Sequence, residues 1–589
     1  MAASHLQQIL GAPRGAASAH QRPPTESDVV VVGSGYGAGV AAARLADAGR
    51  EVTILERGTR WDPGTFPRQL FAAARTFRID WRGRRLVGGG DSLFQLQIGD
   101  SVAVLTGSGV GGTSLINASV LLEPDDDVWL DKRWPTVLTQ EVFAADSPYQ
   151  TAVSRALTML GASRSDRWSA TRKTGAIIEA GVEPTDLARL AVTIADSTNA
   201  AGRFQPACTG CGNCVSGCNV GAKNTVDRNY LHRAIERGAQ VKERHEVISL
   251  RRDDGSGRWL LTVRVPAGRG HFRRRTALRE FAARTVILSA GALGSTSILL
   301  RSTDVATSAR LGQSLSGNGD MLGFVFDPDQ HAGAVANRHD TGDIGPTITA
   351  IARTPESDDV DWIVEDGAIP SALRPVIAPM LWLNSLFNPQ SSGGRRTLGR
   401  RAGRLAAPLF GVRRGAASKA LTLLGMGKDA DVGTLTFRKG RLQLHWSRAT
   451  HAATIDAAHS AMRRIAAGLG GRFVPAPTVG WPLAYLLPTV HPLGGCDMAD
   501  CAEDGVVDHM GRVFQGRTGH TVYPGLYVLD GSIIPVPIGS NPALTITALA
   551  ERALALILAE GHSGTPERSP CQRRPELTDV PHTTPQEPT

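Results

Sequence analysis

The sequence has no hydrophobic run long enough to cross a membrane, and it has few cysteines for its length. No stretch of its 589 residues reaches the roughly 18 apolar residues that a spanning helix needs. Residues 1–27 contain no apolar core of the kind that secretory signals have. Seven cysteines are too few for a disulfide scaffold, and neither a Gly-X-Y period nor an internal repeat is present. These absences predict a folded cytoplasmic protein with a disordered leader at 1–27 and a disordered tail at 561–589.

The sequence also lacks an even spread of charge. Its formal net charge is +9, but residues 367–428 contain ten Lys and Arg residues and no Asp or Glu, so that segment alone carries +10. Because no nucleic-acid-reading motif accompanies this charge, we expect no nucleic-acid partner. Two interpretations of the segment remain open. It is either a solvent-exposed basic surface whose other side packs in the core, or the entrance to the substrate site, which rests peripherally on an anionic membrane.

The first motif that is present is a glycine-rich turn between a strand and a helix. The β-branched run Val29–Val32 is typical of a buried parallel strand, and Gly33-Ser34-Gly35-Tyr36-Gly37-Ala38 follows it. Gly33 lets the chain turn off the strand, and Gly35 lets a pyrophosphate approach the backbone at the helix N-terminus. Glu56 ends the second strand, where a carboxylate accepts hydrogen bonds from ribose hydroxyls. The unit predicts FAD or NAD, and Glu56 disfavours the 2′-phosphate of NADP.

Strands of this nucleotide-binding type recur in the middle and at the end of the chain, whereas the segments between them have a different pattern. We therefore predict an α/β protein with a discontinuous Rossmann-like cofactor domain, formed by residues 28–135, 201–310 and 485–560. An inserted α+β domain with an antiparallel sheet is expected at 136–200 and 311–484. Its alternating residues at 433–446 predict a hairpin that turns at Lys439-Gly440.

Further motifs follow the first turn along the chain: Gly109-Val110-Gly111-Gly112-Thr113-Ser114-Leu115-Ile116-Asn117, Ser289-Ala290-Gly291-Ala292-Leu293-Gly294-Ser295, His491-Pro492-Leu493-Gly494-Gly495-Cys496, and Asp530-Gly531-Ser532 leading to Gly539-Ser540-Asn541-Pro542. In this order they resemble the glucose–methanol–choline (GMC) family of FAD oxidoreductases, and its cholesterol-oxidase branch in particular. The resemblance implies FAD as the cofactor. The cofactor-binding residues that it implies are Gly33, Gly35, Tyr36, Gly37, Glu56, Gly109, Gly111, Gly112, Asn117, Val247, Asp530, Gly531 and Asn541. Among these, the loop that ends at Asn117 resembles the one that passes the flavin, Val247 lies where backbone groups meet the adenine, and Asp530 and Gly531 resemble the ribityl contacts.

Three residues are implied as catalytic by the same resemblance. His491 and Asn541 match the two polar residues that face the substrate over the flavin, and an imidazole suits the transfer of the hydroxyl proton. Asn541-Pro542 is equally compatible with a helix N-cap followed by proline. Glu365 fits the glutamate that cholesterol oxidases carry in a substrate-domain loop before an apolar-Pro pair, where it would move a proton between two carbons. An ordinary surface charge is the alternative for Glu365.

Four of the cysteines lie within eleven residues, as Cys208, Cys211, Cys214 and Cys218. The spacing C-x2-C-x2-C-x3-C is that of bacterial ferredoxins, but there the fourth cysteine ligates another cluster, and no second run exists here. A structural or redox-inert turn, an iron–sulfur cluster and a zinc site all remain open. No metal ligand is assigned.

The sequence as a whole predicts FAD-dependent oxidation of a hydrophobic secondary alcohol. The resemblance implies a 3β-hydroxysteroid such as cholesterol as the substrate, with a Δ5 to Δ4 isomerisation after the oxidation. One alternative is a GMC dehydrogenase that passes electrons from another alcohol to a carrier instead of oxygen. Another is a non-catalytic flavoprotein or electron-transfer module. No obligate protein partner is inferred.

Overall fold

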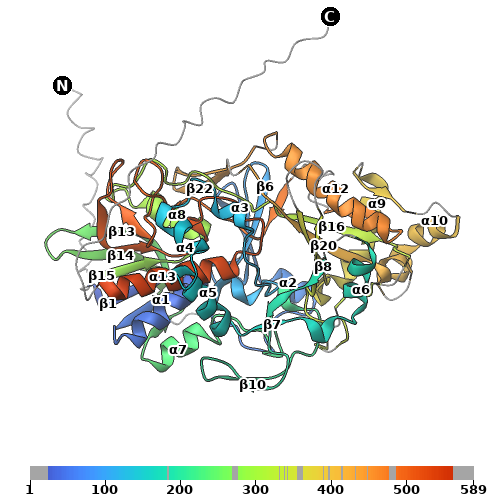
Figure 1. Ribbon diagram of the computed structural model, residues 1–589, viewed down its shortest axis with the longest axis horizontal. Helices are drawn as coiled ribbons and strands as arrows, with labels where there is room; N and C mark the ends of the chain where they lie inside the picture. Colours follow the sequence, from blue (N-terminus) through green and yellow to red (C-terminus); the bar gives the residue numbers. More distant parts are fainter. Residues whose placement is uncertain are drawn as a thin grey trace, which may run out of the picture.

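Two large β-sheets organise the chain, and they occupy opposite ends of the molecule in Figure 1. The computed structural model describes residues 24–181, 185–267, 276–329, 332–336, 339–340, 342–354, 362–388, 390–394, 398–412, 415–430, 433–447, 449–476 and 486–560. Within these residues the protein is a mixed α/β structure with several sheets, as predicted. The finer division into a Rossmann-like domain and an inserted domain stays a prediction.

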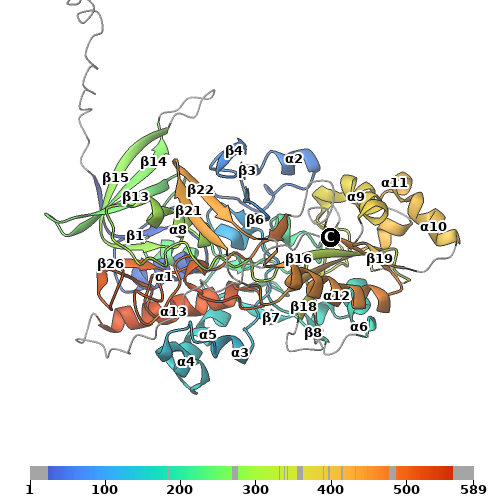
Figure 2. The same cartoon turned by 90° about the horizontal axis from the view of Figure 1, so that it is seen from above.

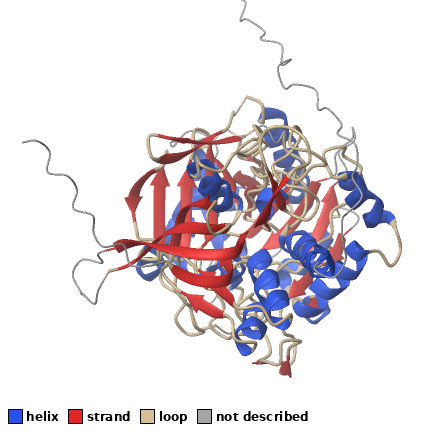
Figure 3. Cartoon of the chain, turned by 90° about the vertical axis from the view of Figure 1, so that its left-hand side faces the viewer, coloured by secondary structure: helices blue, strands red, loops and turns tan. Residues whose placement is uncertain are grey.

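An eight-stranded sheet is built from segments far apart in the sequence. Its parallel part runs in the order β12 (Gln240–Lys242), β2 (Val52–Leu55), β1 (Thr25–Val32), β15 (Thr276–Leu288) and β26 (Val522–Val528). Antiparallel strands complete it: β14 (Arg258–Pro266) pairs with the first part of β15, β13 (Glu246–Asp253) pairs with β14, and β25 (Arg512–Phe514) pairs with β26. Figure 3 views the molecule from the end that carries this sheet. Because the central strands are parallel, their carboxyl ends lie at one edge, where Gly33, Glu56, Ser289 and Asp530 follow.

Helices pack on this sheet through small and aliphatic side chains. The alanine-rich α1 (Tyr36–Asp47) contacts α7 (Tyr230–Glu236) and α13 (Ala543–Glu560). α13 also packs against α5 (Pro148–Met159), and α4 (Thr136–Phe143) packs against α5. Side chains of α4 and α5 belong to the same buried core as β1 and α1. The first part of segment 136–200, predicted with the inserted domain, therefore lies against the larger sheet.

The seven-stranded sheet is antiparallel throughout. Its order is β19 (Ser392–Gly393), β23 (Arg472–Pro475), β16 (Met321–Phe326), β20 (Leu421–Met426), β18 (Trp362–Gly367), β17 (Ala350–Thr354) and β8 (Thr185–Leu187). α12 (Ala452–Gly468) and α6 (Arg172–Glu179) cover one face, over Trp362, Val364 and their neighbours in one core. Since side chains alternate along a strand, Ile363 and Glu365 point to the opposite face.

A five-stranded sheet connects the two cofactor-related loops. It runs in the order β24 (Leu487–Thr489), β6 (Val102–Gly107), β5 (Phe94–Ile98), β3 (Phe77–Trp81) and β4 (Arg84–Val87). β24 and β6 are parallel, with Thr489 opposite Val104. Their carboxyl ends therefore lie side by side, and the chain continues from one into Gly109 and from the other into His491.

Segment 367–428 forms part of the seven-stranded sheet and of the helices next to it. It contains α9 (Arg374–Phe387), α10 (Leu398–Leu405), α11 (Ala407–Phe410) and the strand β20. In Figure 2 the three helices lie at the end of the molecule that is far from β13–β15. β20 is a central strand, so the segment is no simple surface insertion. Among the described helices, none is long and apolar enough to span a membrane.

The remaining described α-helices and strands are short. They are α2 (Leu70–Ala74), α3 (Asp126–Trp129), α8 (Ala292–Arg301), β7 (Ala162–Arg164), β9 (Arg189–Ala191), β10 (Ser197–Thr198), β11 (Phe204–Gln205), β21 (Thr434–Arg438) and β22 (Arg441–His445). β1 begins at Thr25, so residues 25–27 belong to a strand instead of the predicted leader. Residues 1–23 and the predicted tail at 561–589 lie outside the described residues.

Candidate active site

The glycine-rich turn after β1 leaves space where a dinucleotide would need it. Gly33 has a φ of +94°, and a Cβ there would lie 2.3 Å from the Ser289 carbonyl oxygen. A Cβ at Gly37 would lie 1.7 Å from the Leu529 carbonyl oxygen, so the helix packs closely on the sheet. At Gly35, in contrast, a Cβ would meet nothing within 4 Å. No side chain caps the N-terminus of α1, so its first N–H groups face that open space.

Glu56 is buried beside this turn and is held by its neighbours. Its two carboxylate oxygens lie 2.5 Å from Ser34 Oγ and 2.6 Å from the Gly58 backbone nitrogen. Burial raises the pKa of Glu56, and the Ser34 hydrogen bond opposes that rise. Ser34 Oγ also accepts a hydrogen bond from the Gly111 N–H at 3.1 Å. Ser34, which the sequence did not single out, thus joins the first glycine turn to the second glycine loop.

The second glycine loop lies directly against the first turn. Gly109, Gly111 and Gly112 have φ values of +145°, +114° and +58°, and a Cβ at Gly112 would lie 2.8 Å from Gly35 Cα. The loop ends at Asn117, whose Nδ2 donates to Tyr36 Oη at 2.7 Å. The structure therefore brings both glycine segments, Tyr36 and Asn117 together, and their contact with FAD stays a prediction.

Asp530 lies at the same sheet edge and is fully engaged by protein donors. One carboxylate oxygen accepts from the Ser532 N–H (2.9 Å) and Oγ (2.6 Å), and the other accepts from the Gly291 N–H (2.9 Å) and Ser295 Oγ (2.5 Å). Burial raises the pKa of Asp530, which these four bonds oppose. The ribityl contact at Asp530 and Gly531 stays a prediction.

Val247 lies on β13, and its side chain packs in the core of the larger sheet. The adenine contact itself stays a prediction.

His491 is oriented by an aspartate that the sequence analysis missed. His491 Nδ1 lies 2.8 Å from Asp320 Oδ1, and Asp320 Oδ2 accepts from the backbone N–H groups of Val490 and His491 at 2.7 Å and 3.0 Å. The Asp320 side chain is 2% exposed, whereas that of His491 is 13% exposed. Because a carboxylate only accepts, this contact assigns the proton of the neutral imidazole to Nδ1 and leaves Nε2 free to accept.

Glu365 and Asn541 meet on the face of the seven-stranded sheet that is opposite α12 and α6. Asn541 Nδ2 lies 3.5 Å from Glu365 Oε2, at the limit of a hydrogen bond. Glu365 is fully buried, and burial raises its pKa to about 8. Two expectations are wrong here. Glu365 lies in the strand β18 instead of a loop, and its burial excludes an ordinary surface charge.

The N-cap interpretation of Asn541 is also wrong. α13 begins at Ala543, and Asn541 Oδ1 has no hydrogen-bond partner among the described residues. Asn541 is therefore not a capping residue, and its amide oxygen remains available to a ligand.

A second missed residue, Asn318, holds the loop before Asn541. Asn318 Oδ1 accepts from the N–H groups of Ile538 and Gly539, both at 2.9 Å, and its Nδ2 donates to the Ser540 carbonyl at 2.8 Å. Asn318 has a positive φ of 57° and lies two residues before Asp320. One turn before β16 thus positions both the His491 loop and the Asn541 loop. The Gly-Asn-Gly-Asp run at 317–320 was the available sequence signal, since such residues favour tight polar turns.

Several buried polar atoms around these loops have no protein partner among the described residues. They are Ser108 Oγ, Asn117 Oδ1, Ser540 Oγ, Asn541 Oδ1 and Thr545 Oγ1. They belong to the segments that the sequence predicts around a flavin. Since buried polar groups are nearly always satisfied, they indicate a polar ligand at this place, and the residues present fit FAD.

Comparison with known proteins identifies the family of this chain. Models of the GMC oxidoreductase family match residues 37–317 and 438–550. The chain belongs to the GMC oxidoreductase family. It is an oxidoreductase that acts on CH–OH groups, in a family that depends on FAD in general.

Three relatives of this GMC oxidoreductase are similar to it at low identity over most of this chain. A cholesterol oxidase of Acinetobacter baumannii is 29% identical over 90% of this chain and 94% of its own. A cholesterol oxidase of Mycobacterium tuberculosis (strain ATCC 25618 / H37Rv) is 28% identical over 93% of both chains. A long-chain-alcohol oxidase of Arabidopsis thaliana, FAO4B, is 24% identical over 89% of this chain and 66% of its own.

A solved structure shows the same fold. The crystal structure of pyridoxine 4-oxidase from Mesorbium loti matches with a TM-score of 0.54 at 16% identity, over 90% of this chain and 99% of that one. At this identity the likeness concerns the fold alone.

Proposed function

We propose that this GMC oxidoreductase uses FAD to oxidise a hydrophobic secondary alcohol, with 3β-hydroxysteroids as the substrate class. The observation that carries the proposal is that one turn, at Asn318 and Asp320, holds both the loop of His491 and the loop that leads to Asn541, which contacts buried Glu365. The similarity to cholesterol oxidases supports the substrate class. In this proposal residues 28–135, 201–310 and 485–560 form the FAD-binding domain, and the seven-stranded sheet carries the substrate.

FAD, when bound, supplies the acceptor for the hydride of the carbinol carbon. The uncapped N-terminus of α1 and the open space at Gly35 would bind the pyrophosphate. Glu56 would bind the ribose, and the Gly109–Asn117 loop would lie along the flavin. These contacts hold the cofactor without using His491 or Glu365, so binding and chemistry are separable by mutation.

His491 takes the proton of the substrate hydroxyl in this mechanism. Asp320 fixes the ring and its tautomer, so that Nε2 is the accepting atom. Asp320 also stabilises the imidazolium that forms when the proton arrives. Asn541 Oδ1, which has no protein partner among the described residues, orients the hydroxyl from the other side.

Glu365 performs the isomerisation step. A carboxylate in this buried place removes a proton from the carbon next to the new ketone and returns it two carbons further along, which moves the double bond into conjugation. Burial raises the pKa of Glu365 to about 8, so its ionised form is a strong base for a carboxylate. Its position opposite the α12 face supports a role toward the substrate.

The face that carries Glu365 is apolar and incompletely covered. Leu322 and Leu424 lie in the same row of the sheet as Glu365, through the pairings of β16, β20 and β18. Both leucines are only partly buried, although they lie on inner strands. A flat apolar ring system would cover them and remove them from water.

The decisive test is anaerobic mixing of the FAD-loaded protein with separate alcohols. A 3β-hydroxy-5-ene sterol should bleach the flavin, and the conjugated enone should appear in the ultraviolet. Bleaching by long-chain primary alcohols alone would refute the steroid class, and bleaching by no alcohol would refute the proposed chemistry. Reoxidation by air or only by an added dye separates an oxidase from a dehydrogenase.

We further propose that the α9–α11 end of the molecule contacts a membrane from which the alcohol is drawn. Seven large apolar side chains there are exposed: Leu373, Val376, Leu383, Leu386, Phe387, Leu405 and Leu409. Part of the local positive charge is neutralised by ion pairs within the protein, because Arg404 pairs with Asp327 at 3.3 Å and Lys428 pairs with Asp127. α9 packs on β16 and β23, next to the face that carries Glu365. Apolar insertion, more than charge, should therefore drive the contact.

Vesicle binding tests this surface. The double variant Leu405→Ser, Leu409→Ser should lose most binding to vesicles that contain sterol and anionic lipid. The matched control Leu278→Ser, at an exposed apolar residue of β15 at the other end of the molecule, should bind normally. Equal loss in both variants, or unchanged binding in the first, would contradict the proposed surface.

A further inference from the structure

The four cysteines of the C-x2-C-x2-C-x3-C run all line one pocket. Cys211 and Cys214 are buried, Cys208 and Cys218 are partly buried, and none of the four forms a disulfide. The rest of the lining is mostly backbone and small apolar side chains, with Lys223 as the charged member. The ferredoxin rule, in which the fourth cysteine serves a second cluster, does not apply because Cys218 lines the same pocket as the other three.

We propose that Cys208, Cys211, Cys214 and Cys218 bind an iron–sulfur cluster of the [4Fe–4S] type beside the predicted flavin loop. Cluster binding stands on the cysteine pocket alone. Its use in electron transfer rests on the proposed FAD function.

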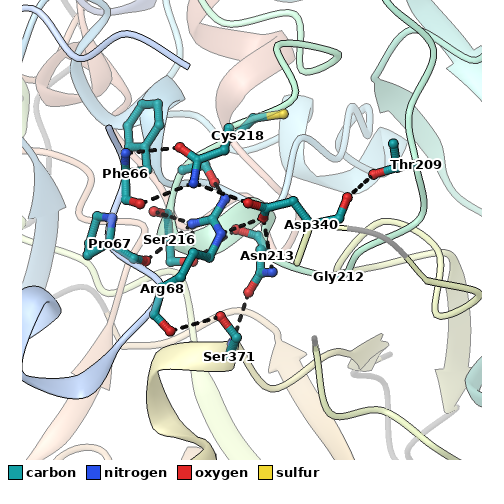
Figure 4. Close-up of polar contacts among 12 residues, drawn as sticks. Phe66, Pro67, Arg68, Thr209, Gly212, Asn213, Ser216, Cys218, Asp340 and Ser371 are labelled. Carbon is teal, nitrogen blue, oxygen red and sulfur yellow. Dashed lines mark hydrogen bonds and ion pairs between the residues drawn. The ribbon is translucent and has the colours of Figure 1, made fainter. Parts of the chain in front are cut away.

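The cysteine loop is held rigidly from outside the pocket. Figure 4 shows Arg68 paired with Asp340, with Nε 2.5 Å from Oδ1. Asp340 also accepts from Asn213 Nδ2 at 3.3 Å, and Arg68 donates to the Gly217 carbonyl at 2.8 Å. Cys218 lies beside this network in the same view. The loop is thus fixed by polar contacts that leave the thiols unused, as a preorganised ligand set requires.

Backbone donors point at the sulfur atoms. The Gly210 N–H lies 3.4 Å from Cys208 Sγ, and the Gly221 N–H lies 3.3 Å from Cys218 Sγ. Gly210 and Gly221 have φ values of +69° and +88°, conformations that other residues rarely adopt. Hydrogen bonds to cysteine sulfurs stabilise the thiolate charge and tune cluster potentials.

The described cysteines are not placed to bind a single zinc ion. Four thiolates on one Zn²⁺ would place their sulfurs about 3.8 Å apart, from Zn–S bonds of about 2.3 Å in a tetrahedron. Within the part of the chain that the structure describes, no group of three or more Cys, His, Asp or Glu side chains is placed to hold a metal ion. A cluster differs because its iron and sulfide atoms lie between the cysteine sulfurs and hold them farther apart.

Lys223 connects the pocket to the flavin loop. Its buried Nζ donates to the Asn117 carbonyl and to the Cys214 carbonyl, the latter at 3.3 Å. One side chain therefore bridges the cysteine loop and the loop that is predicted to pass the flavin. A cluster held by the four cysteines would supply one-electron chemistry. It would accept the two electrons of the reduced flavin one at a time and deliver them to a one-electron carrier protein, while two protons go to water.

The test is the iron and acid-labile sulfide content after anaerobic reconstitution with ferrous iron and sulfide. We expect about four of each per chain, with a visible absorbance that dithionite bleaches. Cys214→Ala should remove at least about nine-tenths of both. The control Cys496→Ala, at a buried free cysteine outside the pocket, should keep them.

Three results would overturn the proposal. The first is folded wild-type protein with fewer than about one iron and one sulfide per chain after reconstitution. The second is zinc bound without sulfide, and the third is equal iron loss in Cys496→Ala and Cys214→Ala. A failure of the FAD proposal is distinguishable, because the cluster content and its bleaching by dithionite would remain while the alcohol would reduce nothing.

Discussion

Replacing Glu365 by glutamine should remove a pH dependence from the stability of the protein. Glu365 is fully buried, Oε1 has no hydrogen-bond partner among the described residues, and burial raises its pKa from 4.5 to about 8. Between these values the folded state holds a proton that the unfolded state has lost. The contribution of Glu365 to the free energy of unfolding is therefore fully present below pH 4.5 and decreases as the pH rises toward 8.

The size of the effect follows from the two pKa values. The full window is about 3.5 pKa units, which at about 1.36 kcal/mol per unit gives about 5 kcal/mol. From pH 6 to pH 8 the loss is about 2 kcal/mol, because the carboxyl is already half ionised at the upper limit. Glu365→Gln keeps the shape of the side chain and its contact with Asn541 but cannot ionise. The decrease in unfolding free energy that Glu365 causes between pH 6 and pH 8 should therefore vanish.

The measurement is urea unfolding of the FAD-saturated protein at pH 6 and pH 8. The difference between variants cancels the other titrating groups. Glu236→Gln, at an exposed carboxyl of α7, is the matched control and should keep the wild-type slope. If Glu365→Gln lost the same free energy as wild type between the two pH values, the raised pKa would be wrong, and with it the basis for a strong base at this site.

Three further outcomes test the site. His491→Gln should slow anaerobic flavin reduction by about 10²–10⁴-fold while FAD stays bound, whereas unchanged reduction would exclude His491 as the proton acceptor. Asp320→Asn should slow the same step by about 10²-fold or more by disturbing the His491 tautomer, and a change in KM alone would contradict a positioning role. Gly112→Ala should weaken FAD binding in a fluorescence titration, because its Cβ would lie 2.8 Å from Gly35 Cα. Gly440→Ala has a similarly positive φ but no neighbour within 4 Å, so it should bind FAD normally.

The parts of the fold that sequence predicted well are those whose signals are local. The turn after β1 needs glycine at Gly33 for its positive φ and at Gly37 for close packing, and both requirements are visible in a short stretch of residues. The hairpin turn at Lys439-Gly440 is local in the same way. In these cases the residue type is dictated by the backbone, so the residue reveals the conformation.

The groups that the sequence analysis missed act over long separations in the chain. Asp320 meets His491 across 171 residues, and Asn318 meets Ile538 across 220 residues. Aspartate and asparagine in a Gly-rich turn are ordinary loop residues by composition. Only the sheet that brings β16 beside the two loops gives them a role, so no local pattern could have assigned it.

The strand β18, which carries Glu365, is the element that the sequence analysis predicted as a loop. Two adjacent acids, Glu365 and Asp366, are unusual in a buried strand, but alternation sends them to opposite faces. Asp366 pairs with buried Lys173 at 2.7 Å and accepts from the Thr349 and Ala350 N–H groups at 2.6 and 2.9 Å.

The ion pair fixes which face each acid takes. A slip of one residue would place Asp366 toward the substrate and leave the Lys173 ammonium buried without its partner, which is strongly unfavourable. Burial already lowers the pKa of Lys173, so the Asp366 contact is what favours its charge. The buried pair behind the sheet therefore sets the register that leaves Glu365 beside Asn541, on the face where a neutral apolar substrate would lie.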